Sequence, residues 1–176
     1  MKYLFKKLPI TVVFFANMLL QANATEFINE TPKIEQNLDA FHQAAAEANF
    51  DKYFSLLAKE AIFIGTDGNE RWTKESFAEF VRPYFSEGRG WLYTPTERHV
   101  TVLANKSVAF FDESLINASY GQTRGSGVLI KTEQGWKIAQ YNLSIPMPNA
   151  LTKDLVQQIK QFHQAQSKMK GSSGND

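Results

Sequence analysis

The most informative segment of the chain runs from Arg124 to Pro146. It reads Arg124-Gly-Ser-Gly-Val-Leu-Ile-Lys131, then Thr132-Glu-Gln-Gly135, then Trp136-Lys-Ile-Ala-Gln-Tyr-Asn-Leu-Ser-Ile-Pro146. Two runs rich in β-branched and aromatic residues, joined by a short polar turn that contains glycine, predict a β-hairpin. This stretch is therefore expected to form two paired strands.

The alternation of side chains along this hairpin predicts which residues face inward. If Lys131 and Lys137 point to water, the inward face holds the following residues: Arg124, Ser126, Val128, Ile130, Trp136, Ile138, Gln140, Asn142 and Ser144. This face is apolar near the turn and polar at the far end, as expected for a sheet that lines a pocket. A buried arginine needs a carboxylate, a ligand or water, so a structural salt bridge at the end of the sheet is the alternative role of Arg124.

The first 24 residues are typical of a secretory signal peptide. Lys2, Lys6 and Lys7 precede a largely apolar stretch, and Ala22-Asn23-Ala24 has the small-residue pattern of a cleavage site. The apolar stretch is shorter than the roughly 20 residues that a membrane-spanning helix needs. We expect cleavage after Ala24, a periplasmic or secreted protein, and no membrane association of the mature chain. An uncleaved membrane anchor is the alternative.

Composition narrows the class of protein further. The chain has no cysteine, so an exported form must rely on its core without disulfides. The formal net charge of +1 falls to −2 when the three lysines of the leader are removed, which leaves no basic surface for nucleic acid. The 14 phenylalanines favour a large aromatic core or an aromatic pocket.

The order of elements predicts an α+β domain over residues 25–150. Helical spacing begins at Thr31-Pro32, a short second helix follows Asn49, a strand covers Ala61 to Gly65, and Thr73 caps a third helix. Four strands come next, the second of them from Val108 to Asn117. Helices followed by a strand meander favour a curved antiparallel sheet covered by helices on one face. An amphipathic helix is expected over 151–170 and a disordered tail over 171–176.

These features resemble the SnoaL-like branch of the nuclear transport factor 2-like superfamily. The resemblance is carried by Phe63-Ile-Gly-Thr-Asp67, Glu70-Arg-Trp72, Arg124-Gly-Ser-Gly-Val-Leu129 and Trp136-Lys-Ile-Ala-Gln-Tyr-Asn-Leu-Ser144, in that order. It implies a cone-shaped barrel with a pocket, commonly dimeric through its sheet. The superfamily includes isomerases, dehydratases, cyclases and binding modules, so fold likeness does not by itself define the function.

One position departs from the resemblance. Many SnoaL-like sequences carry histidine where Asn142 stands, and asparagine cannot exchange a proton near neutral pH. An amide still offers a hydrogen-bond donor and an acceptor to a ligand. Asn142 therefore favours ligand binding over acid–base chemistry.

Two carboxylates are candidates for catalysis, Asp67 after a strand and Asp112 within one. A lone carboxylate in apolar surroundings can act as a general base or acid. Asp67 is equally consistent with a turn, since Asp-Gly is a common turn pair. Either Asp112 or its neighbour Glu113 faces inward, where it could instead pair with Arg124.

The leading hypothesis is a domain that binds a small, largely apolar molecule. The proposed ligand-binding residues are Asp67, Trp72, Trp91, Phe110, Arg124, Ser126 and Asn142; the aromatic ones could equally fill the cone. No cofactor is expected, and no metal, since no histidines have ligand spacing and cysteine is absent. The alternatives are an isomerase, dehydratase or cyclase that uses a pocket carboxylate, and a homodimeric interaction module whose outer sheet face carries Ala139, Tyr141, Leu143 and Ile145.

Overall fold

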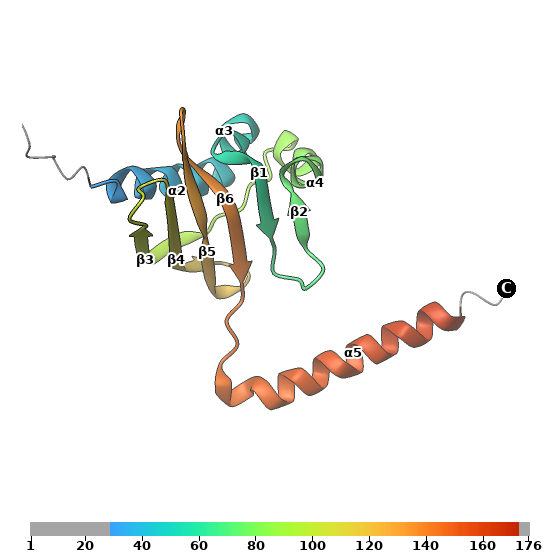
Figure 1. Ribbon diagram of the computed structural model, residues 1–176. Helices are drawn as coiled ribbons and strands as arrows, with labels where there is room; N and C mark the ends of the chain where they lie inside the picture. The colour runs from blue at the N-terminus through green and yellow to red at the C-terminus, as the bar shows by residue number, and fades with distance from the viewer. Residues whose placement is uncertain (1–28, 173–176) are drawn as a thin grey trace, which may run out of the picture.

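The computed structural model describes residues 29–172, which form an α+β domain followed by a long helix (Figure 1). The expected signal peptide and its cleavage site lie outside the described residues. So does 173–176, the end of the C-terminal tail.

Three helices cover one face of the sheet, and each begins where the sequence supplies a local signal. Helix α2 spans Thr31–Ala46 and has proline near its start. Helix α3 spans Phe50–Ser55, and the Asn49 side chain caps it by accepting a hydrogen bond from the Lys52 backbone. Helix α4 spans Lys74–Ser86 and is capped in the same way by Thr73. Each helix buries its apolar side against the sheet.

The sheet has six strands in the order β2-β1-β6-β5-β4-β3 and does not close on itself. The strands are β1 (Leu57–Ile64), β2 (Arg71–Thr73), β3 (Thr94–Val102), β4 (Val108–Asn117), β5 (Gly121–Thr132) and β6 (Gly135–Ser144). The hairpin predicted from the sequence is β5–β6. The sheet is mixed rather than wholly antiparallel, because β1 pairs with β6 in parallel.

The inward residues predicted for β6 are confirmed near the turn, but the prediction is wrong for the rest of the strand. Trp136 and Ile138 are buried, but the next buried side chains are Tyr141 and Leu143. The pairing shifts register here: Leu129 pairs with Ile138, and Val128 pairs with Gln140. Ala139 is thus the extra residue of a β-bulge, which exchanges the two faces of the strand beyond it. Gln140, Asn142 and Ser144 consequently lie on the outer face, away from the helices.

The prediction for β5 is wrong along the whole strand. It assumed that Lys131 points away from the helices, but Lys131 lies on the side that the helices cover. Lys131 pairs with the inward-facing Trp136, its ammonium lies 3.0 Å from Glu30 Oε1, and it lies 6.0 Å from the centre of the Trp136 ring. The buried residues of β5 have the same parity: Thr123, Gly125 and Leu129. Arg124, Ser126 and Val128 therefore lie on the outer face.

Aromatic rings fill the space between the helices and the sheet. Phe63 stacks on Phe77 with ring centres 4.0 Å apart, and on Tyr141 at 5.6 Å. Phe41 stacks on Tyr53 at 4.4 Å. Aliphatic side chains such as Leu38, Leu115 and Ile138 complete a core that excludes solvent. Over the residues that the structure describes, the space between the helices and the sheet is thus largely packed.

The last helix, α5, spans Thr152–Ser172 and follows the short 3₁₀ helix η2 at Asn149–Leu151. Figure 1 shows α5 extending away from the sheet and from the other helices. Its described side chains are nearly all exposed. Across residues 29–172, no helix is both long and apolar enough to span a membrane.

Candidate functional site

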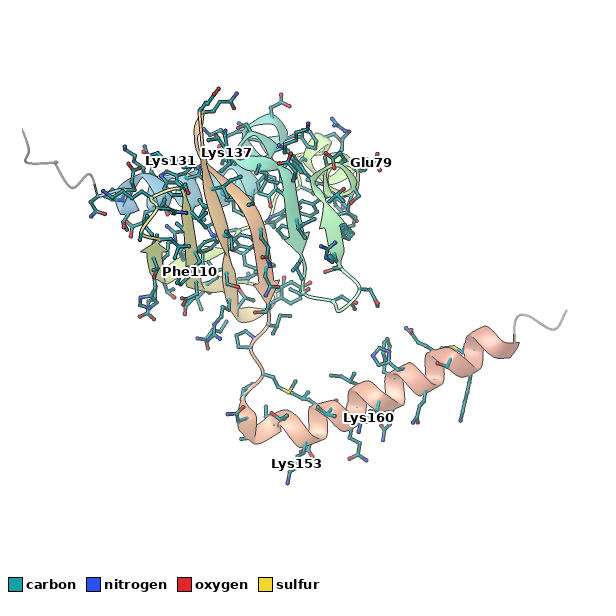
Figure 2. The ribbon with its side chains drawn as sticks, viewed as in Figure 1. Glu79, Phe110, Lys131, Lys137, Lys153 and Lys160 are labelled. Carbon is teal, nitrogen blue, oxygen red and sulfur yellow. The ribbon has the colours of Figure 1, made fainter. Side chains whose placement is uncertain are left out.

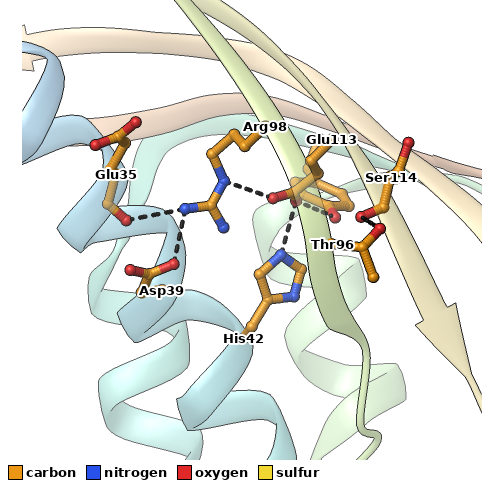
Figure 3. A network of polar contacts seen from close by, with 8 residues as sticks. Glu35, Asp39, His42, Thr96, Arg98, Glu113 and Ser114 are labelled. Atoms are coloured by element: carbon orange, nitrogen blue, oxygen red, sulfur yellow. Dashed lines mark hydrogen bonds and ion pairs between the residues drawn. The ribbon is translucent and has the colours of Figure 1, made fainter.

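A buried polar cluster lies where α2 crosses β3 and β4, with Glu113 at its centre (Figure 3). Glu113 is 1% exposed. Its Oε1 lies 2.7 Å from His42 Nε2 and accepts a hydrogen bond of 2.9 Å from the Tyr141 hydroxyl. Its Oε2 accepts a hydrogen bond of 2.8 Å from Arg98 Nε. The Glu113 cluster thus consists of Glu113, His42, Tyr141 and Arg98.

Arg98 connects this cluster to the surface of α2. Its Nη1 donates to Asp39 Oδ1 at 2.7 Å and to the Glu35 carbonyl at 3.3 Å. The guanidinium therefore carries one buried and one exposed carboxylate partner, since the Asp39 side chain is 68% exposed. This pairing offsets the cost of burying both charges beneath the helix.

The electrostatics fix the protonation of two members of the cluster. Burial raises the pKa of the Glu113 carboxyl, but hydrogen bonds and charge from His42 and Arg98 outweigh it and lower the pKa overall. Burial, and then the adjacent Glu113 charge, raise the pKa of the Tyr141 phenol well above its usual value. Glu113 is therefore a carboxylate and Tyr141 a neutral hydrogen-bond donor at physiological pH.

Gly125 makes room for the cluster on the neighbouring strand. It pairs with Glu113 across β4–β5 and with Leu143 across β5–β6. A Cβ atom at position 125 would overlap the Tyr141 hydroxyl and the Glu113 carboxylate. The first glycine of the motif Arg124-Gly-Ser-Gly therefore serves a close approach of side chains.

A small void borders the Glu113 cluster, and an apolar concavity lies between this void and the surface. The void is about 20 Å³, enough for one water molecule, and its lining includes His42, Tyr53 and Tyr141. The concavity, here called the aromatic mouth, is about 260 Å³ and is lined chiefly by Phe63, Phe80, Trp91, Tyr93, Tyr120 and Glu70. Phe63, Trp91 and Tyr93 line both, so the void lies directly behind the mouth.

The two concavities of largest volume suit an apolar ligand less well. One of about 680 Å³, near the β5–β6 turn, has a lining rich in charged side chains, among them Lys59, Glu60 and Glu133. Another of about 470 Å³ lies on the outer face of the sheet between β1, β5 and β6, where Ile62, Ile64 and Val128 adjoin Arg71. Neither borders the Glu113 cluster.

The structure brings only part of the predicted site to the mouth. Trp91 lines it, whereas Trp72 does not line it and contacts it only through Phe80, whose ring centre lies 4.6 Å from that of Trp72. Asp67 is exposed in the turn after β1, where its Oδ1 accepts a hydrogen bond from the Asn69 backbone. Asp67 is therefore a turn-forming residue, and the mouth carboxylate in this loop is Glu70.

The other predicted site residues lie on the outer face of the sheet. Phe110 and Asp112 are exposed on β4, and Arg124 is exposed on β5 (Phe110 is labelled in Figure 2). Ser126 and Asn142 are half-buried and pair with each other in the β5–β6 register. The inward carboxylate is Glu113 rather than Asp112, and its arginine partner is Arg98 rather than Arg124. Tyr141 and Leu143, expected on the outer face, are buried.

Sequence reasoning missed His42 and Arg98. His42 is four residues after Leu38 on α2, so helical spacing alone places it on the buried side. Arg98 pairs directly with Glu113 across β3–β4, a register that the sequence does not supply. A polar residue on a buried helix face was the available signal, and it indicated a buried partner.

Residues 34–148 match the SnoaL-like domain family, and the chain therefore belongs to that family. Among curated proteins, none matches the sequence significantly. The match ends before α5, so this helix is an addition to the family domain.

Solved structures confirm the nuclear transport factor 2-like fold. A candidate dehydratase from Streptomyces avermitilis is similar with a TM-score of 0.59 and 14% identity, over 68% of this chain and 97% of that one. A candidate aromatic ring hydroxylase from Novosphingobium aromaticivorans gives 0.55 and 20%, over 65% and 87%. A candidate scytalone dehydratase from the same organism gives 0.56 and 11%, over 67% and 85%. At such identities the likeness shows the fold alone.

Proposed function

We propose that this domain binds a small, largely apolar molecule with a ring system in the aromatic mouth. The observation that carries the proposal is the chemistry of the lining. Six aromatic side chains, Phe77 among them, surround about 260 Å³, with Glu70 as the charged group at the rim. Apolar concavities with few polar groups are the usual sites for small molecules. A bicyclic aromatic compound with one hydroxyl group matches this space and polarity.

Direct binding of 2-naphthol tests the proposal, measured by saturation-transfer NMR and calorimetry. Thr66 lines the mouth and is exposed, so Thr66→Trp should fill the mouth without disturbing the core. We expect affinity to fall by roughly tenfold or more, equivalent to about 1.4 kcal/mol. Thr101→Trp, at an exposed position on β3, is the matched control and should bind like the parent.

Arg124→Ala separates this proposal from a site on the outer face. Arg124 lies on the side of the sheet opposite the mouth, so its removal should leave 2-naphthol binding unchanged. Loss of binding in Arg124→Ala, with normal binding in Thr66→Trp, would move the site to the outer face and overturn the proposal.

A second candidate function is proton transfer of the isomerase or dehydratase type. The observation that favours it is the position of His42, which lines the void behind the mouth while Glu113 holds its Nε2. A carboxylate that holds one imidazole nitrogen fixes the orientation of the ring, so that the other nitrogen can transfer a proton. In this arrangement His42 is the acid–base group, and Glu113 positions it. Asp67 and Asp112 have no place in such a site.

Hydrogen–deuterium exchange of 2-tetralone in D₂O tests this second function. The reaction removes a proton from the carbon next to the carbonyl and returns a deuteron, so it requires no cofactor. Exchange faster than in buffer, and lost in a folded His42→Gln variant, would support it. Equal exchange in the two proteins would exclude a role for His42 in proton abstraction.

A further inference from the structure

Helix α5 carries an apolar stripe that the family domain does not use. Its side chains at Leu155, Ile159 and Phe162 are spaced by four and then three residues, the spacing of a heptad seam. We call these three residues the α5 stripe. Ile159 is 47% exposed and Phe162 is 59% exposed. Because most helical stability in water comes from packing of the apolar face, such a stripe implies a partner.

We propose that α5 is a self-association helix, which pairs through the α5 stripe with α5 of a second copy of this chain, parallel and in register. The residues that flank the stripe favour this partner. They are Val156, Gln158, His163 and Ala165, and none carries a carboxylate, an ammonium or a guanidinium group. Two copies can therefore approach without repulsion between like charges along the seam.

Three of the four lysines of α5, Lys153, Lys160 and Lys168, lie away from the seam, and Lys170 continues the flank that contains Val156 and His163. Lys153 and Lys160 are seven residues apart and share one side of the helix (Figure 2). Helices that lie on anionic membranes carry basic residues on a polar face that meets the headgroups; here Gln157, Gln161 and Gln164 share the polar face with the lysines and Asp154. The uncharged flanks also disfavour the outer face of the sheet, since they would cover Arg124 and Asp112 without pairing their charges.

Gln166 favours the parallel arrangement over the antiparallel one. It continues the seam at the position seven residues after Ile159. In a parallel, in-register pair, Gln166 faces its own copy, and the two side-chain amides can hydrogen-bond to each other. In an antiparallel pair it would face an apolar residue near the start of the partner helix, which leaves a polar group without a partner.

Disulfide cross-linking of the full chain tests the proposal, because the native sequence contains no cysteine. Leu155→Cys and Gln166→Cys place a thiol at either end of the seam. In a parallel pair each residue faces its own copy within the 4.4–6.8 Å Cα separation that a disulfide requires. We expect mild oxidation to convert most of each variant to a covalent dimer. Gln157→Cys and Gln164→Cys, on the opposite side, are the controls and should remain monomeric on denaturing gels.

The other outcomes each overturn the proposal. Cross-linking only in a mixture of Leu155→Cys and Gln166→Cys would show an antiparallel pair. Equal cross-linking at stripe and control positions would show random collision. Absence of cross-links, together with binding to vesicles of phosphatidylcholine and phosphatidylglycerol, would show a membrane-surface helix. Sedimentation equilibrium supplies an independent measure: Phe162→Glu should weaken association, and Gln164→Glu should not.

Discussion

His42 Nε2 lies 2.7 Å from Glu113 Oε1, and this contact joins α2 to β4 in the interior of the domain. The same carboxylate oxygen accepts a hydrogen bond from the hydroxyl of Tyr141 on β6. A single buried carboxylate therefore connects a helix and two strands that lie far apart in the sequence. Such a contact serves the fold whether or not a ligand enters the mouth.

Removing the central carboxylate should destabilise the domain strongly. Glu113→Ala leaves Arg98 with only the exposed Asp39 as an acidic partner and leaves the Tyr141 hydroxyl buried without an acceptor. We expect the free energy of unfolding to fall by about 3–5 kcal/mol, typical of breaking a buried ion pair. Urea denaturation followed by circular dichroism measures it. Asp112→Ala, next to it but exposed, should change stability by less than about 0.5 kcal/mol.

Arg98 on β3 and Arg124 on β5 should differ in their contribution to stability in the same way. Arg98 binds Glu113 and Asp39, whereas Arg124 is exposed on the outer face. Arg98→Ala should lower the midpoint of urea unfolding clearly, and Arg124→Ala should shift it little. A large loss of stability in Arg124→Ala would contradict the outward orientation of β5.

Substitution at Gly125 should be costly because of its neighbours rather than its backbone. Gly125→Ala forces the new methyl group against Tyr141 and Glu113, and we expect a loss of about 1–3 kcal/mol. In a Tyr141→Phe background the added cost should be smaller, because the hydroxyl that clashes is gone. A double-mutant cycle measures this coupling. Gly68→Ala, where a Cβ meets no atom within 4 Å, is the control.

The free energy of unfolding should depend on pH in the acid range because of Glu30. Its carboxylate accepts hydrogen bonds from Trp136 Nε1 and from Lys131, and these lower its pKa from 4.5 to about 2. Because the folded pKa lies below the unfolded one, the stabilisation is fully present above pH 4.5 and is lost as the pH falls toward 2. The stability difference between the parent and Glu30→Gln should therefore shrink over that interval. A difference that does not change with pH would show that Glu30 is not held ionised by these contacts.

The sequence was enough to predict the helices and five of the six strands in their order, but not the short strand β2 at Arg71–Thr73. Local signals sufficed for the helix starts at Asn49 and Thr73, for β4 at Val108–Asn117, and for the β5–β6 hairpin. These features depend on residues a few positions apart, so periodicity and capping specify them. The motifs from Phe63 to Ser144 also sufficed to indicate the SnoaL-like family.

The direction in which the side chains of the hairpin point depends on tertiary contacts that the sequence pattern does not reveal. The bulge at Ala139 and the contact of Lys131 with Glu30 both depend on pairing across elements, and a shift of one residue exchanges the two faces of a strand. For that reason Arg124, Ser126 and Asn142 lie outside, and Tyr141 and Glu113 lie inside. The joining of His42, Arg98 and Glu113 likewise required the packing of α2 over β3 and β4, since these residues are separated by up to 71 positions in the chain.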